Sequence, residues 1–135
     1  MPQTIIQIVR EISDSLTQST AQTRNLAEKL GTIYEKIFDQ LQVTPKFEGI
    51  TAITVMPQAT SDEPSHIRIR LAKAITLNEL VIAFGNYDES PPMENEPAHA
   101  IFEFNTSSTT HRATLMAPLD SDSATTLTLR RDMIP

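Results

Sequence analysis

Residues 5–40, IIQIVREISDSLTQSTAQTRNLAEKLGTIYEKIFDQ, carry the strongest pattern in this chain of 135 residues. Apolar or small side chains recur at alternating steps of four and three residues, which is the 3.5-residue period of a coiled coil. We predict a continuous helix of about 38 residues, ~57 Å long at 1.5 Å per residue. The predicted seam of this coiled coil consists of Ile5, Val9, Ile12, Leu16, Ser19, Thr23, Leu26, Leu30, Ile33 and Ile37.

The residue types along the predicted seam indicate how many helices would associate. The d positions hold Ile5, Ile12 and Ile33, and the a positions hold Leu16 and Leu30. Parallel dimers favour the reverse arrangement, with β-branched residues at a and leucine at d. We therefore expect a homo-oligomer in which a parallel trimer is favoured.

Two other interpretations of this stretch stay open. The polar residues 19–23 could form the turn of a helical hairpin, although they contain neither glycine nor proline. Alternatively, an amphipathic helix could pack against the chain's own domain and bury the same apolar stripe there.

The remainder of the chain, residues 44–135, indicates a β domain that follows an N-terminal helical segment at 1–43. Of the nine prolines only Pro2 precedes Pro45, so turns are concentrated in the second part. Periodicity and β-branched composition predict strands at 47–56, 65–71, 100–104, 112–116 and 125–130. We expect an α+β fold in which the long helix leads into a small antiparallel β sandwich or barrel.

The run 80–84 is ambiguous. It is continuously apolar and contains two β-branched residues, so we interpret it as a buried strand. The preceding Thr76 and Glu79 also match the capping box of a short helix.

The formal net charge is −6, and much of it falls between residues 88 and 99, where no basic residue occurs. We expect these residues to form an acidic loop that faces a partner protein, with its carboxylates supplied by Asp88, Glu89, Glu94 and Glu96. No part of the chain is basic enough for the phosphate contacts of a nucleic-acid-binding protein. The pair at Arg130 and Arg131 is interpreted as a solvated strand end.

The residue types give little support to catalysis. Without cysteine, disulfides, thiolate chemistry and cysteine zinc sites are excluded. His66, His99 and His111 lack the spacing that presents two histidines to one metal ion. No nucleophile elbow and no phosphate-binding glycine loop occurs. We expect no catalytic residues, no metal site and no cofactor, and the apolar runs are too short for membrane insertion.

These features predict a non-enzymatic structural or attachment subunit that oligomerises through its N-terminal helix and contacts another structural protein. In architecture, a short coiled coil before a threonine-rich, cysteine-free β head resembles the small trimeric fibres, spikes and capsid-decorating proteins of tailed phages. The resemblance implies a location in the virion, whereas a cellular protein of this kind would be cytoplasmic. The alternatives are a monomeric α+β adaptor or assembly chaperone, and a small metal-dependent enzyme.

Overall fold

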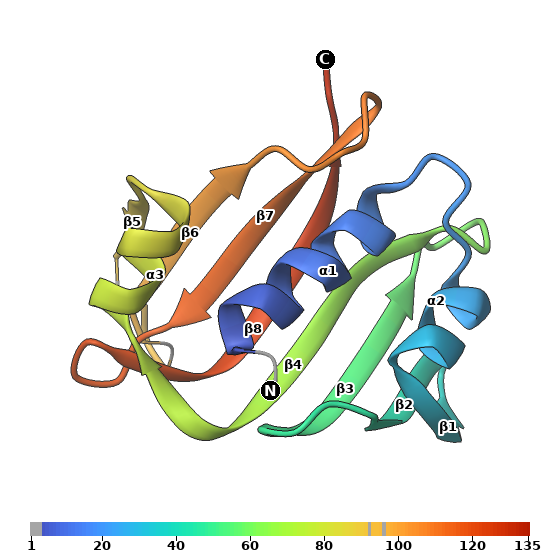
Figure 1. The fold of residues 1–135 in the computed structure, drawn as a ribbon, viewed down its shortest axis with the longest axis horizontal. Coiled ribbons are helices and arrows are strands. Elements are labelled where there is room, and N and C mark those ends of the chain that lie inside the picture. Colours follow the sequence, from blue (N-terminus) through green and yellow to red (C-terminus); the bar gives the residue numbers. More distant parts are fainter. Residues whose placement is uncertain (1–3, 92, 96) are drawn as a thin grey trace.

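The computed structural model describes residues 4–91, 93–95 and 97–135. Within them the chain forms one eight-stranded antiparallel sheet and three short helices (Figure 1). The helices are α1 (Ile5–Thr17), α2 (Thr23–Leu30) and α3 (Leu77–Phe84). The strands are β1 (Gly31–Ile37), β2 (Gln40–Pro45), β3 (Ile50–Pro57), β4 (Pro64–Thr76), β5 (Asp88–Ser90), β6 (His99–Phe104), β7 (His111–Pro118) and β8 (Ser123–Met133).

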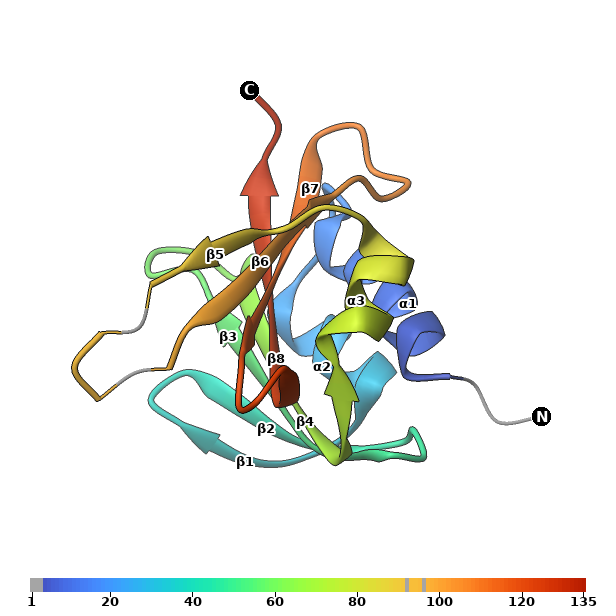
Figure 2. The same cartoon turned by 90° about the vertical axis from the view of Figure 1, so that its left-hand side faces the viewer.

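The strands lie in the order β1-β2-β3-β4-β8-β7-β6-β5, and every neighbouring pair is antiparallel. Two four-stranded meanders, β1–β4 and β5–β8, therefore meet at the pair β4–β8. The sheet is strongly curved, and the helices lie on its concave side (Figure 2). This arrangement leaves β1 at one edge of the sheet and β5 at the other.

The hydrophobic core fills the space between the concave face and α1. One row of paired residues crosses six strands, and each of its members is at most 4% exposed: Leu41, Val55, Ile67, Leu129, Leu115 and Phe102. From α1 the residues at most 1% exposed include Ile8, Val9, Ile12 and Leu16. The apolar stripe of α1 thus completes the core of its own chain.

The predicted long coiled-coil helix is wrong. α1 ends at Thr17, α2 is only eight residues long, and residues 31–37 form strand β1. The predicted sandwich or barrel is also wrong, because the strands form a single open sheet. An apolar stripe at helical spacing suits packing on a sheet as well as packing on another helix, so the heptad pattern did not separate the two.

The end of α1 and the start of α2 are set by hydrogen bonds to residues far away in the sequence, although the heptad pattern runs on through both positions. Gln18 leaves the helical conformation, and its carbonyl accepts a hydrogen bond of 3.1 Å from Nη2 of Arg131. At the start of α2, the amide and the hydroxyl of Thr23 both donate to the carbonyl of Asp62, each over 2.7 Å. The two helices are therefore held separately by β8 and by the β3–β4 loop.

Gly31 allows the chain to turn from α2 directly into β1. Its amide donates to the carbonyl of Ala27 and closes the last turn of α2. A Cβ atom at this position would lie 1.9 Å from the carbonyl oxygen of Thr44 on β2. Only glycine permits this approach of the two backbones.

Several strand predictions are confirmed, since β4, β6, β7 and β8 contain the runs 65–71, 100–104, 112–116 and 125–130, and β3 covers most of 47–56. The interpretation of 80–84 as a strand is wrong: this run belongs to α3. Thr76 and Glu79 form the capping box that starts the helix, with both reciprocal hydrogen bonds present. None of the described helices is long and apolar enough to span a membrane.

Candidate interaction site

The hairpin formed by β1 and β2 lies at one edge of the sheet (Figure 1). β1 pairs with β2 on one side only, so its other side is an open edge where backbone amides and carbonyls can pair with a further strand. The register shifts between Ile33 and Glu35, which marks a bulge at Tyr34. At the opposite edge of the sheet, β5 is only three residues long.

The turn of this hairpin has an unusual sequence for its conformation. Ile37 pairs with Gln40, so the two-residue turn consists of Phe38 and Asp39, with φ angles of 51° and 68°. Two consecutive positive φ angles are the signature of a type I′ turn, for which Asn-Gly and Asp-Gly are preferred. A bulky aromatic residue at positive φ is a genuine outlier. Phe38 therefore makes the folded protein less stable than asparagine or glycine would at this position.

Phe38 gains no burial in return, since its side chain is 92% exposed. Tyr34 and Ile37 on the same hairpin are 62% and 41% exposed. Three large, exposed apolar side chains therefore lie on the one hairpin at this edge of the sheet. We call Tyr34, Ile37 and Phe38 the hairpin patch.

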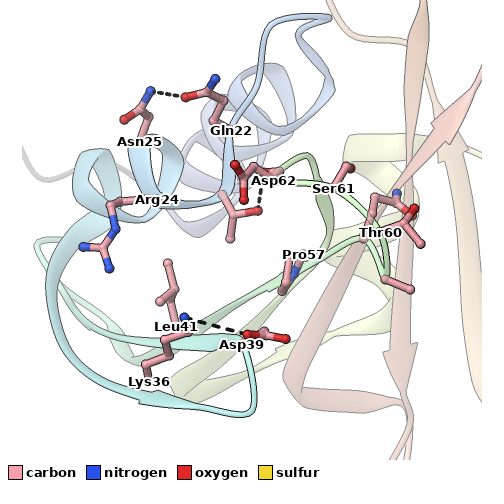
Figure 3. A pocket seen from close by; sticks show the side chains of 13 residues that line it. Gln22, Arg24, Asn25, Lys36, Asp39, Leu41, Pro57, Thr60, Ser61 and Asp62 are labelled. Atoms are coloured by element: carbon pink, nitrogen blue, oxygen red, sulfur yellow. Dashed lines mark hydrogen bonds and ion pairs between the residues drawn. The ribbon is translucent and has the colours of Figure 1, made fainter.

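A polar pocket of about 540 Å³ lies beside the hairpin, between β1–β2, the start of α2 and the β3–β4 loop (Figure 3). Lys36 and Asp39 contribute from the hairpin, Arg24 from α2 and Asp62 from the loop. The Lys36 ammonium and the Asp39 carboxylate lie 3.7 Å apart, and both side chains are well exposed. The pocket therefore combines two cations and two carboxylates at the surface, which suits polar groups of either charge.

In the described part of the chain, no group of three or more His, Asp or Glu side chains is arranged so that it could hold a metal ion. His66 lies on the convex face of the sheet, and its pKa is lowered by burial and by the charges of Arg68 and Arg130. The pKa of His111 is lowered by burial and by Arg131, against the opposing effect of Glu63.

Arg130 and Arg131 lie on opposite faces of β8. Arg130 is half-exposed and its Nε donates to Oδ1 of Asp132 over 2.8 Å. Burial alone would raise the pKa of Asp132, but hydrogen bonds from Arg130 and Thr114 and the charges of Arg130 and Arg112 outweigh it, so this pKa is lowered. The Arg131 side chain is only 3% exposed. The interpretation of the pair as a solvated strand end is therefore wrong for Arg131.

The residues of the predicted seam are spread over four parts of the fold. Ile5, Val9, Ile12 and Leu16 belong to α1, Ser19 to the α1–α2 loop, Thr23, Leu26 and Leu30 to α2, and Ile33 and Ile37 to β1. Six of these side chains are buried in the chain's own fold: Val9, Ile12, Leu16, Thr23, Leu26 and Leu30. Ser19 and Ile37 are exposed.

The predicted acidic loop is partly a strand. Asp88 and Glu89 are exposed on β5, and Glu94 is exposed in the turn that follows. Glu96 lies outside the described residues. A contact between these carboxylates and a partner stays a prediction.

Phe38 and Tyr34 are absent from the residues predicted from the sequence, because a helix through residue 40 assigns no turn there. A usable signal is present. The β-prone run TIYEKI at 32–37 and the alternating QLQV at 40–43 are separated by two residues, which is the spacing of a β-hairpin.

Comparisons with protein-family models, with curated proteins and with solved structures find no significant match to this chain.

Proposed function

We propose that the protein is a non-enzymatic binding subunit that recognises a partner protein with its β1–β2 hairpin. The observation that carries the proposal is Phe38, a large aromatic residue that is 92% exposed at a positive φ angle. Strained residues persist at recognition sites when function requires them. Aromatic side chains also dominate the hot spots of protein interfaces.

The energetics favour a role in the bound state. Left-handed backbone costs an ordinary residue roughly 1–2 kcal/mol, and the free protein recovers none of this through burial of Phe38. An interface hot spot contributes about 2 kcal/mol or more when its side chain enters a pocket. A partner with an apolar pocket for Phe38 would therefore offset the cost of the turn.

The surroundings of Phe38 specify further contacts. A partner that covers the hairpin patch would also meet the open edge of β1, to which an extended segment can add as a further strand. Beside it, the polar pocket offers Arg24 and Asp62 for hydrogen bonds. This function does not require a coiled coil. It also does not require the resemblance to phage fibres, because that resemblance included a coiled coil.

Site-specific photo-crosslinking in cells of the source organism tests this proposal. A photo-reactive benzoylphenylalanine at position 38 keeps an aromatic ring at the turn. Met133, at the end of β8 and 75% exposed, is the matched apolar control position. Illumination is expected to give one adduct of defined mass from position 38 and none from position 133.

Competition in a cell extract makes the test specific. For a partner other than this chain, an excess of wild-type protein should suppress the adduct, whereas the same excess of the Phe38→Asn variant should not. The proposal fails if position 38 gives no adduct, if position 133 gives the same adduct, or if both competitors suppress it equally.

A further inference from the structure

A second cavity, of about 610 Å³, lies between the N-terminal part of α1, the end of β4 and α3. We call it the apolar cleft, because most of its lining is apolar: Ile5, Ile6, Ala74, Ile75, Ile82 and Ala83. Ile82 on α3 is 78% exposed at this cleft. The volume falls within the roughly 300–1,000 Å³ that is typical of binding pockets.

The charged groups around the cleft differ in what they already bind. Nη2 of Arg10 donates to the carbonyl of Ala83 over 2.5 Å, and its guanidinium lies 5.0 Å from the centre of the Phe84 ring. Oε2 of Glu79 accepts from the amide of Thr76, the N-cap residue of α3. The side chain of Lys73 has no hydrogen bond or ion pair within the described residues. The cleft therefore offers an apolar lining and one cation that is available for an acidic group.

We propose that the apolar cleft of one copy of this chain receives the Phe38 tip of a second copy. The inference rests on the proposed function, because it names the partner that the hairpin recognises. Phe38 on one surface and Ile82 on the other are both large, apolar and largely exposed in the single chain. Docking would remove both from water at once.

The charges of the two surfaces are complementary, which favours a second copy as the occupant. Asp39 follows Phe38 in the turn, and its side chain is 85% exposed. A docked tip would bring this carboxylate to the rim, where Lys73 lies. Glu79 is held in the capping box of α3, so Lys73 is the charge of the lining that is available to the tip. The exposed acid of the tip thus meets the available base of the rim.

The elements that carry the two surfaces lie apart, since β1 and β2 are at the right of Figure 1 and α3 is at the left. The tip of a chain is therefore remote from its own cleft, and each contact joins different surfaces of two copies. Such a heterologous contact leaves one free tip and one free cleft, so association continues until a ring closes or a chain grows.

Sedimentation equilibrium on purified protein over a wide concentration range tests the inference. The wild type is expected to exceed the 15.0 kDa mass of one chain increasingly as its concentration rises. Phe38→Asn removes the tip, and Ile82→Asp places a charge in the cleft at an exposed position. Each variant alone should remain at 15.0 kDa, whereas Met133→Asp, a control at another exposed apolar residue, should associate like the wild type.

Mixing the two variants gives the sharpest result. The Phe38→Asn variant retains an intact cleft, and the Ile82→Asp variant retains an intact tip. An equimolar mixture should therefore form a complex of one copy of each and no larger species. A mixture that stays at the mass of one chain overturns the inference, as does a wild type that is monomeric throughout.

Charge reversal identifies the contact between the two copies. Asp39→Lys and Lys73→Asp should each weaken association up to about fivefold, as expected for an exposed ion pair, and the double variant should restore it. Failure of rescue contradicts the proposed docking. A monomeric wild type that still gives the residue-38 adduct with a different protein would refute self-docking and leave the proposed function standing. A monomeric wild type together with the absence of any residue-38 adduct would refute both the self-docking and the proposed function.

Discussion

Phe38 and Asp39 are consecutive residues that both adopt positive φ angles, 51° and 68°, at the tip of the β1–β2 hairpin. Glycine is preferred at the second position of a type I′ turn. Asp39→Gly should therefore raise the free energy of unfolding by about 0.5 kcal/mol, after the greater flexibility of glycine in the unfolded chain is deducted. The exposed pair with Lys36 contributes little to offset this gain. Urea unfolding measures the change, and a loss of stability would contradict the assignment of the turn.

A substitution at Gly31 tests the direct connection between α2 and β1. Gly31→Ala would place a Cβ atom 1.9 Å from the carbonyl oxygen of Thr44, so the start of β1 and the end of β2 would have to separate. We expect a loss of about 3 kcal/mol or more, at the upper end of single-residue effects. Thermal unfolding followed by circular dichroism checks this. A variant as stable as the wild type would show that α2 does not pass directly into an edge strand.

Arg131 and Arg130 lie on opposite faces of β8, so alanine substitutions at the two positions can be compared directly. Arg131→Ala removes the donor to Gln18 and leaves a cavity in the core, so we expect a loss of about 2–4 kcal/mol. Arg130→Ala removes a half-exposed ion pair with Asp132 and should cost less than about 1 kcal/mol. Urea unfolding of both variants at pH 7 gives the comparison. Equal losses would contradict the different burial of the two side chains.

His66 makes stability depend on pH. Its pKa in the folded protein lies below the 6.5 of the free side chain, because burial and then Arg68 and Arg130 disfavour its protonation. The unfolded chain therefore binds this proton more readily, and stability is lost as the pH falls from about 6.5 through the folded pKa. His66→Gln should reduce that loss. Unfolding free energies between pH 7.5 and about pH 5 measure it, and an unchanged pH dependence would contradict the assignment.

The sequence predicted a helical conformation for residues 5–17, although not the end of that helix, and it predicted β3, β4, β6, β7 and β8, because these signals are local. Val9, Ile12 and Leu16 recur at helical spacing and are buried on one face of α1. β4 shows the same agreement, since Ile67 and Ile69 alternate with exposed arginines. Each pattern reports which side of an element is buried. It does not report what covers that side.

The helix boundaries within residues 17–37 could not be predicted in this way. The end of α1 depends on Arg131, which lies more than a hundred residues further along the chain, and the start of α2 depends on Asp62. Gly31 was a local signal for the end of α2 that the unbroken heptad phase concealed. The strand β1 exists through pairing with β2, which a helical interpretation of residues 31–37 excludes.

The candidate site was missed because the heptad pattern assigned residues 31–37 to a helix. Phe38 is notable only because it occupies a turn, and the turn becomes visible only when residues 31–37 are assigned to a strand. The exposed position of Ile82 likewise follows from the helical conformation of α3. Both residues are ordinary apolar residues in the sequence.

The central claim is that Phe38 occupies its turn at a cost to the free protein. Urea unfolding of the wild type and of Phe38→Asn tests it most directly, at a protein concentration low enough to prevent association. Asparagine tolerates positive φ, so the variant should be more stable by about 0.5–1 kcal/mol with an unchanged denaturant slope. A variant less stable than the wild type would show that Phe38 serves the fold, which would contradict its assignment as a recognition residue.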